Sequence, residues 1–356
     1  MRFLHTADWH IGKKLQGYDR IKEQEHVLTQ ILAIAKEENV DAIVIAGDLY
    51  DRSVPSVDAI EVFNQLMVEW NLREGFPIFA ISGNHDSGIR LSTGTPWFSQ
   101  SDYYLQTRLP EAFQPIIFKD TQFFLLPYFE PISARIYFED EQIRTIQQAM
   151  EKVIEKMKTQ FDSTKKQVLV SHFFVTGSMK SDSETKIEVG GLDAVPGDLL
   201  EPFDYVALGH LHNQAALNQK KGVWIVDLEE DVSLNFRELT PLYDIEEITA
   251  SFKELLNPDF YQTINRENYL QIYLEDRTII PNMMNQLRKI YPRILGVERS
   301  NGRVELKQGK QKKMMTKDPH KIAQGFFKEM TKEQLTNKQE IWLKETLQEL
   351  TDRNDQ

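Results

Sequence analysis

The chain has 356 residues, of which 41% are hydrophobic and 27% are charged, as in a folded globular protein of two or three domains. It contains no cysteine, which excludes disulfides and thiolate chemistry, and no apolar run approaches the roughly 18 residues that cross a membrane. A cytoplasmic protein is therefore expected, and the net charge of −12 argues against one that coats nucleic acid over its whole surface.

The first half of the chain alternates apolar strands with amphipathic helices. The segments "RFLHTAD", "DAIVIAGD" and "FPIFAISGNHD" are predicted strands, and helical spacing of apolar residues is found at 19–40 and 56–70. This β-α-β-α-β order predicts an α/β fold. Further strands are expected at 120–129, 166–174, 203–212, 222–228 and 232–239.

Near residue 260 the pattern changes to a small strand–helix–strand unit, "NYLQIYLED", "IIPNMMNQLRKIYPR" and "ILGVERS". A Lys-rich segment follows. Two helices are then expected, one beginning at Asp318-Pro319 and one capped by Thr336 with Gln339. We therefore expect a main domain at 1–260, a small α/β domain at 261–317 and C-terminal helices at 318–356.

Basic residues are concentrated in one part of this acidic chain. Between Asn285 and Lys328 twelve Lys and Arg face three acidic residues, a net +9 that leaves −21 for the rest. Such a segment is either a solvated basic face or a surface that contacts a phosphate backbone. Composition alone does not choose between the two.

Polar side chains gather where the predicted strands end. The set comprises Asp8, His10, Asp48, Asp51, Asn84, His85, Asp86, His172, His210 and His212. Each motif alone has a structural explanation, such as a turn or a buried histidine. Because open α/β sheets place ligand sites beyond the carboxyl ends of their strands, the ordered set predicts one shared crevice.

The residue types in this set indicate a metal site. Carboxylate, imidazole and amide oxygen without thiolate suit Mn²⁺, Fe²⁺ or Zn²⁺, and there are enough such groups for two ions. Two ions about 3.5–4 Å apart clamp a phosphate and lower the pKa of a bound water. The hypothesis is that Asp8 and His10 hold the first of them.

The series DxH, GDxxD, GNHD, a single His and GHxH resembles that of the calcineurin-like metallophosphoesterases. Together with "HTADWHIGKK", "SHFFVTGSMKSDSE" and "FDYVALGHLH", it makes residues 1 to about 330 similar to the SbcD family, the nuclease subunits of bacterial complexes that process DNA ends. The resemblance implies a two-sheet metallophosphoesterase sandwich with a small α/β capping domain and C-terminal helices. One departure is the short segment 213–222, which puts the rim beside His212 in doubt.

The resemblance also implies roles for single residues. Asp8, His10 and His212 are expected to bind one metal, Asn84, His172 and His210 the other, and Asp48 to bridge both. His85 is expected to stabilise the transition state or protonate the leaving oxygen, and Asp86 either to orient His85 or to cap a turn. Asp51 is expected to be structural. Candidates for DNA phosphate contacts, with solvated charge as the alternative, are Lys13, Lys14, Arg52 and Arg90.

The function expected from the resemblance is that of a two-metal DNA exonuclease and endonuclease. It would use Mn²⁺ and metal-activated water, act on double-stranded DNA ends and hairpins, and form a homodimer. The C-terminal helices would bind an SbcC-like ATPase subunit. The alternatives are another metallophosphoesterase, acting as a phosphatase or nucleotidase, and a module that tethers DNA ends.

Overall fold

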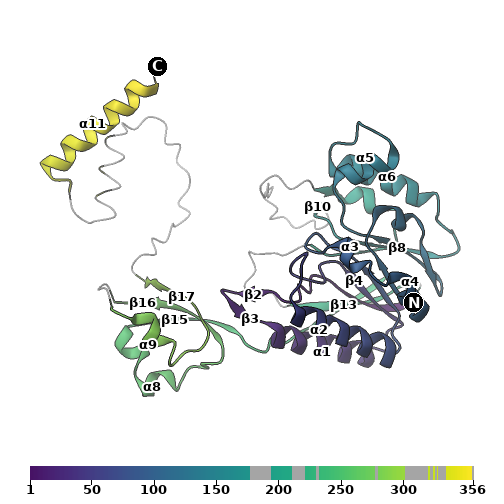
Figure 1. Ribbon diagram of the computed structural model, residues 1–356, viewed down its shortest axis with the longest axis horizontal. Coiled ribbons are helices and arrows are strands. Elements are labelled where there is room, and N and C mark those ends of the chain that lie inside the picture. The colour runs from purple at the N-terminus through teal and green to yellow at the C-terminus, as the bar shows by residue number, and fades with distance from the viewer. Residues whose placement is uncertain are drawn as a thin grey trace. The chain divides into compact units, whose positions relative to one another are not determined.

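The computed structural model describes residues 1–176, 194–210, 221–229, 232–276, 280–300, 320, 324, 327 and 334–354. The chain divides into two units, Met1–Glu298 and Arg299–Gln356 (Figure 1). Among the described residues, no helix is long and apolar enough to cross a membrane.

A six-stranded sheet forms the first layer of the main domain. Its central strands β1, β4, β5 and β6 are parallel, whereas β13 is antiparallel to β1 and β14 is antiparallel to β13. In spatial order the strands are β14 (Ser233–Glu238), β13 (Gly222–Asp227), β1 (Arg2–Thr6), β4 (Ala42–Ala46), β5 (Ile78–Ile81) and β6 (Tyr103–Gln106).

A four-stranded sheet forms the second layer. Its strands β12, β9 and β8 are parallel, and β7 is antiparallel to β8. In spatial order they are β12 (Tyr205–Leu208), β9 (Lys166–Ser171), β8 (Thr121–Leu126) and β7 (Ile116–Phe118). Two short pairs lie outside these sheets: β2 (Lys14–Leu15) with β3 (Tyr18–Asp19), and β10 (Val175–Thr176) with β11 (Val195–Pro196).

The two sheets pack face to face through a continuous apolar core. The rings of Phe79 and Phe123, one from each sheet, stack with their centroids 4.1 Å apart, and both are fully buried. The strands that supply this core are apolar on both faces because helices cover their outer sides. Continuous runs such as "AIVIA" in β4 follow from that arrangement.

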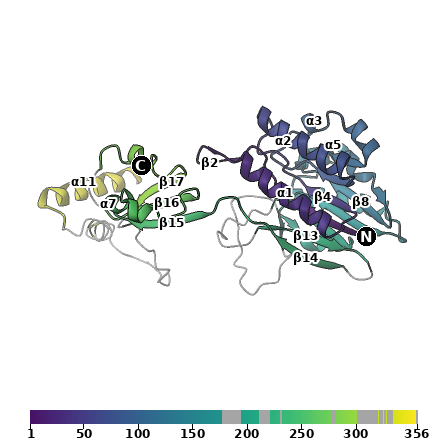
Figure 2. The ribbon, with the colours of Figure 1, turned by 90° about the horizontal axis from the view of Figure 1, so that it is seen from below.

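Helices cover the outer face of each sheet. On the six-stranded sheet lie α1 (Ile21–Glu37) and α2 (Val57–Met67), which continues as a π-helical turn over Val68–Arg73 (Figures 1 and 2). On the four-stranded sheet lie α5 (Pro131–Phe138) and α6 (Ile146–Lys158). The short helices α3 (Gly88–Leu91) and α4 (Thr95–Phe98) follow β5. The expected two-sheet sandwich is confirmed.

A third sheet has its own apolar core, built around Leu270, Ile272 and Tyr291. Its order is β15 (Ile245–Ala250), β16 (Tyr269–Leu274) and β17 (Ile294–Arg299), with helices α7 (Phe252–Leu255), α8 (Pro258–Tyr261) and α9 (Met283–Leu287). The predicted strand–helix–strand unit is confirmed, but β15 was not expected. It lies before residue 260 and joins this sheet by pairing in parallel with β16. The proposed domain boundaries remain a prediction.

The C-terminal helix α11 (Asn337–Asn354) begins where its cap was expected. The backbone N–H of Thr336 donates to Gln339 Oε1 at 2.9 Å, and the N–H of Gln339 donates to Thr336 Oγ1 at 3.4 Å. This reciprocal pair is a capping box. The Lys-rich segment 301–317, Asp318-Pro319 and most of the first predicted C-terminal helix lie outside the described residues.

Candidate metal centre

The carboxyl ends of strands from both sheets meet at one place. In the six-stranded sheet β1 is followed by Asp8 and His10, β4 by Asp48 and β5 by Asn84. In the four-stranded sheet β9 is followed by His172 and β12 by His210. His212 lies outside the described residues.

Three of these residues form a first cluster. His10 Nε2 lies 3.5 Å from Asp48 Oδ2 and 3.9 Å from Asp8 Oδ1. One ligand atom from each of the three lies within 4.8 Å of the others, close enough to surround one ion. His10 and Asp48 are buried, so that their polar atoms are directed into this cluster and away from bulk water.

A second cluster is centred on the Asn84 carboxamide. Asn84 Oδ1 lies 3.0 Å from His172 Nε2 and 3.0 Å from His210 Nδ1. His172 Nε2 also lies 3.3 Å from Asp48 Oδ2. The same Asp48 oxygen therefore faces the histidine of each cluster, and the two clusters adjoin at this carboxylate.

The backbone is left-handed at several of these residues. The φ angles are +56° at Asp8, +44° at His10, +52° at Asp48 and +80° at His210. Asp, Asn and His tolerate this region better than other side chains, and such conformations gather at functional sites. Hydrogen bonds join the loops here: Asp8 N–H donates to Gly47 O at 3.0 Å, and His210 N–H to Asp8 Oδ2 at 3.0 Å.

The donor set and its surroundings fit a divalent cation. His172 Nδ1 lies 2.8 Å from Ala46 O, and a carbonyl only accepts, so Nδ1 carries a hydrogen. Its Nε2 faces two further acceptors, Asp48 Oδ2 and Asn84 Oδ1, so that only a proton or a metal ion on Nε2 satisfies these oxygens. Burial acts to lower the pKa of His172, but the bond and charge of Asp48 prevail and raise it. The pair thus attracts positive charge, which a metal ion supplies.

Two glycines leave the room that this packing requires. Gly47 has a φ of +86°, and a Cβ there would lie 2.5 Å from His172 Nδ1. A Cβ at Gly83 would overlap the Asp48 carboxylate. The glycines that begin GDLYD and GNHD are therefore required, because the side chains of His172 and Asp48 approach the backbone too closely for any Cβ atom.

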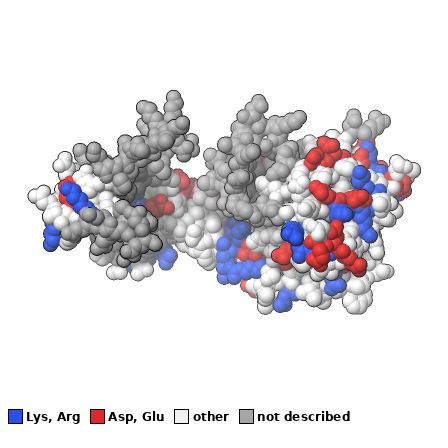
Figure 3. All heavy atoms as spheres, turned by 90° about the horizontal axis from the view of Figure 1, so that it is seen from above, with Lys and Arg blue, Asp and Glu red and all other residues white. Residues whose placement is uncertain are grey.

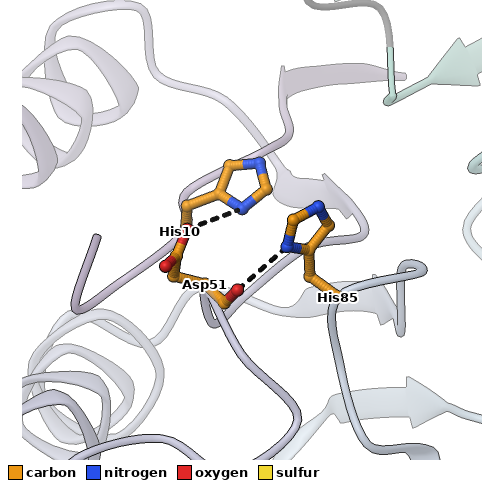
Figure 4. A group of neighbouring side chains, drawn as sticks. All are labelled: His10, Asp51 and His85. Carbon is orange, nitrogen blue, oxygen red and sulfur yellow. Dashed lines mark hydrogen bonds and ion pairs between the residues drawn. The ribbon is translucent and has the colours of Figure 1, made fainter. Parts of the chain in front are cut away.

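His85 lies beside the first cluster with an exposed side chain. Its N–H donates to Asp48 Oδ1 at 2.9 Å, its Nδ1 lies 2.9 Å from Asp51 O, and its ring is 4.6 Å from that of His10. Figure 4 shows the two rings next to each other with Asp51 beside them both, and the Asp51 carboxylate lies 3.8 Å from His10 Nδ1. Since Asp51 O accepts from Nδ1, the other ring nitrogen, Nε2, is the proton carrier available to a substrate.

The sequence did not predict the contact that Asp51 makes with His85, and it left two roles open for Asp86. Asp51 supplies the carbonyl that orients His85, a contact that no side-chain motif encodes. The Asp86 carboxylate accepts backbone N–H groups from Leu49 at 3.0 Å, Tyr50 at 2.9 Å and Gly83 at 2.9 Å. Burial raises the pKa of Asp86 to about 6, although these three donors act in the opposite sense. Asp86 thus ties the GDLYD loop to the GNHD loop.

The basic residues chosen as DNA contacts lie close in sequence to the residues of this centre, with Lys14 on β2 and Arg90 on α3. Lys13, Lys14, Arg52 and Arg90 are all exposed, and the Arg52 side chain is 78% exposed although its Nε lies 3.7 Å from Asp51 Oδ2. Figure 3 shows one face of the molecule, on which some basic side chains gather in one group and others lie among acidic side chains. The contacts of these four residues with DNA remain a prediction.

A cavity of about 630 Å³ adjoins the second cluster. It reaches from the GNHD loop to the segment after β6 and the start of α5, and its lining includes Asn84, Thr107, Arg108, Tyr128, Ser133 and Tyr137. The hydroxyl of Thr107 is buried and has no hydrogen-bond partner among the residues that the structure describes. The lining combines aromatic rings with polar groups, as small-molecule sites do.

Comparison with known proteins identifies the family. Residues 1–214 match the calcineurin-like phosphoesterases. The chain belongs to the calcineurin-like phosphoesterase family. Family membership implies that the candidate centre binds divalent metal ions, in keeping with the clusters of His and Asp.

The remainder of the chain also has relatives. Residues 241–331 match a family described as the type 5 capsule protein repressor C-terminal domain. Over 381 aligned residues the chain is 33% identical to the SbcD subunit of the nuclease SbcCD from Staphylococcus epidermidis (strain ATCC 12228 / FDA PCI 1200), covering 99% of this chain and all of the relative. The expected resemblance to the SbcD family of phosphoesterases is confirmed.

Proposed function

We propose that this chain is the nuclease subunit of an SbcCD-type complex, a DNA exonuclease and endonuclease that depends on two metal ions. The observation that carries the proposal is the Asp48 carboxylate, which faces His10 at 3.5 Å and His172 at 3.3 Å through the same oxygen. A carboxylate shared by two clusters is the arrangement that a two-metal phosphodiesterase needs.

The two ions are Mn²⁺ in this proposal. Asp8, His10 and His212 hold one, Asn84, His172 and His210 hold the other, and Asp48 bridges them. Bound ions supply charge to neutralise the scissile phosphate and lower the pKa of water to near neutrality. The mixed oxygen and imidazole ligands suit Mn²⁺.

His85 acts on the leaving oxygen. Asp51 O fixes the hydrogen on Nδ1, so a protonated ring offers its second proton from Nε2 on the exposed side. The N–H bond to Asp48 holds the histidine beside the metal centre. Asp86 supports this geometry by joining the two loops through hydrogen bonds, and it takes no direct part in the reaction.

The DNA substrate needs room and positive charge around the centre. The cavity beside Asn84 accommodates a nucleotide next to the scissile phosphate, with Arg108 at its wall. Lys13, Lys14, Arg52 and Arg90 contact neighbouring phosphates, and the domain at 261–317 caps the site. Because the chain as a whole carries −12, such local cations are necessary for binding DNA.

The partners are double-stranded DNA ends and hairpins, an SbcC-like ATPase and a second copy of the chain. The C-terminal helices dock on the ATPase, and the side chains of Ile341 and Trp342 on α11, 56% and 57% exposed, offer an apolar contact. The second copy is proposed from the resemblance to the SbcD family.

End-labelled duplex DNA tests the proposal directly. Purified protein with Mn²⁺ is expected to degrade the duplex, protein without Mn²⁺ to leave it intact, and His85→Ala to degrade it far more slowly. A phosphopeptide and a nucleotide monophosphate are assayed in parallel. Faster hydrolysis of either would favour the phosphatase or nucleotidase alternative, and DNA binding without any Mn²⁺-dependent cleavage would favour an end-tethering module.

A further inference from the structure

One side chain in the first turn of α1 holds the loop that carries His10. Gln24 Oε1 accepts the backbone N–H of Gly12 at 2.9 Å. Its Nε2 donates to the carbonyls of Trp9 at 3.1 Å and His10 at 2.6 Å. Three backbone groups of one short loop are therefore bonded to a single carboxamide, and the carbonyl of His10 also accepts the backbone N–H of Lys13 at 3.0 Å.

This loop has little regular structure of its own. Its φ angles are +56° at Asp8, +44° at His10 and +91° at Gly12. A loop that is left-handed at every second residue forms no helix or strand of its own, so its polar groups are bonded to other segments, among them the carbonyls of Asp48 and Leu49. The carboxamide offers an acceptor and two donors at once, whereas a glutamate in its place would offer acceptors only.

The preceding residue, Glu23, connects the same turn to the third sheet. Glu23 is buried, and its carboxylate accepts from Arg20 Nε at 2.8 Å and from the hydroxyl of Tyr269 on β16 at 2.5 Å. Burial, together with the bond to Glu23, raises the pKa of Tyr269 to about 12. The hydroxyl therefore stays protonated and donates to Glu23 at every physiological pH.

A second contact runs from the β2–β3 hairpin to the third sheet. The hydroxyl of Tyr18 accepts the backbone N–H of Ile294 at 3.2 Å and lies 3.3 Å from its carbonyl. The rings of Tyr18 and Tyr269 meet edge to face at 5.9 Å. The start of α1 thus contacts the His10 loop through Gln24 and β16 through Glu23, and the hairpin before it contacts β17 through Tyr18.

We propose that Gln24 is a positioning residue for the His10 loop, and that Glu23 and Tyr269 make this loop sensitive to the position of the third sheet. The proposal rests on the proposed function insofar as the loop is taken to hold a metal ion. A displacement of β16 pulls on Glu23, and the neighbouring Gln24 passes the change to the carbonyl of His10. The centre would then respond to whatever the third sheet binds.

Amide hydrogen exchange of the metal-free full-length chain tests the positioning role. Gln24→Ala is expected to speed exchange at least tenfold in the peptide covering residues 9–14, because Gly12 loses its acceptor. The matched control is Gln30→Ala: Gln30 is on the same helix and bridges both backbone groups of Thr240, at 3.0 Å and 2.8 Å. It should leave peptide 9–14 unchanged. Unchanged exchange in Gln24→Ala would overturn the proposal.

A second variant keeps the test decisive if Gln24→Ala does not fold. Gln24→Glu retains the volume and the acceptor for Gly12, but it sets a carboxylate against the carbonyls of Trp9 and His10. Faster exchange in peptide 9–14 is again expected. Exchange equal to that of the unchanged chain would show that these carbonyls do not depend on residue 24 and would contradict the positioning role.

Tyr269→Phe tests the link to the third sheet. Removal of its hydroxyl is expected to speed exchange in peptide 9–14 as well as around β16. Tyr291→Phe is the matched control, because Tyr291 is also buried, belongs to the apolar core of the third sheet and donates its hydroxyl to Leu255 O at 2.9 Å rather than to Glu23. If both variants leave peptide 9–14 unchanged, or both alter it equally, the proposed link is wrong.

Mn²⁺ titration by calorimetry separates this inference from the proposed function. Gln24→Ala is expected to weaken Mn²⁺ binding about 10–100-fold, the usual effect of removing a group that orients a ligand, and Gln30→Ala to leave it unchanged. An unchanged chain that binds no Mn²⁺ would refute the metal centre, while the exchange data would still decide the role of Gln24. Wild-type Mn²⁺ affinity in Gln24→Ala would count against the positioning role.

Discussion

The imidazole of His172 lies 3.3 Å from the carboxylate of Asp48, although the two residues follow strands of different sheets. Asp48 follows β4 of the six-stranded sheet and His172 follows β9 of the four-stranded sheet. The candidate centre therefore lies across the joint between the sheets. Its geometry depends on the apolar packing between them, such as the stacked rings of Phe79 and Phe123.

The bridging role of Asp48 predicts the loss of both ions from Asp48→Ala. No remaining side chain would face both clusters, so neither ion would keep its full set of ligands. Metal content after dialysis against Mn²⁺ measures this, with Arg52→Ala as the control from the same loop, which should retain two ions because the Arg52 side chain is 78% exposed. Two tightly held ions in Asp48→Ala would refute the bridge.

His85→Ala is expected to retain Mn²⁺ and DNA binding but to lose most of the cleavage rate. A positioned general acid contributes roughly 10²–10⁴-fold, and the backbone N–H that meets Asp48 survives the substitution. Single-turnover cleavage and Mn²⁺ titration of the same preparation give the two quantities. Loss of metal would mean that His85 is a ligand, as its proximity to His10 and Asp51 also permits.

Asp86→Asn is expected to destabilise the metal-free chain by about 2 kcal/mol. One oxygen that accepts a backbone N–H is replaced by an amide that can only donate, so a buried donor loses its partner. Thermal unfolding without metal measures the change. If Asp86→Asn unfolds as the unchanged chain does but cleaves DNA far more slowly, Asp86 acts in the chemistry rather than as a brace.

Replacing Lys13, Lys14, Arg52 and Arg90 singly by Gln tests the DNA surface. Each residue that contacts a phosphate should reduce the slope of log affinity against log salt by about one, without changing sequence preference. Lys152→Gln on α6 is the control, since Lys152 lies 3.7 Å from Asp140 on the outer side of the four-stranded sheet. An unaltered slope identifies solvated surface charge.

Truncation after Lys317 is expected to preserve Mn²⁺-dependent cleavage and to abolish co-purification with the ATPase. The removed part includes α11, with its exposed Ile341 and Trp342. A milder variant, Trp342→Ala, should weaken the association without altering cleavage. Undiminished co-purification of the truncated chain, or its failure to fold, would contradict the assignment of this region.

Much of the candidate centre was predictable because its residues stand at fixed points of a repeating pattern. Parallel strands end at a common edge, so Asp8, Asp48 and Asn84 could be expected together before any distance was known. The pairing of His172 with Asp48 follows from the same rule once both sheets are known to face each other. Sequence periodicity carries this information because burial on both faces requires continuous apolar strands.

Other features depend on tertiary contacts that leave no local signal. Gln24 lies in an ordinary amphipathic helix, and nothing in its neighbours shows that its carboxamide meets the His10 loop. Asp51 was expected to be structural because its useful atom is a backbone carbonyl, which every residue possesses. The strand β15 was missed because "IEEITA" is largely exposed and becomes a strand only by pairing with β16.

The order in which the centre is assembled follows from the positions of its residues along the chain. Asp8 and Asp48 are synthesised early, whereas His172 and His210 come more than a hundred residues later, and β13, which pairs with β1, follows both. During synthesis the early strands thus have no complete metal site to hold them together. Until then the two carboxylates have no metal ion to neutralise their charge, and β1 lacks the neighbour β13 on one side. Before the second sheet is synthesised, only apolar packing stabilises the nascent strands. Metal binding therefore stabilises the completed protein and not its first folded parts.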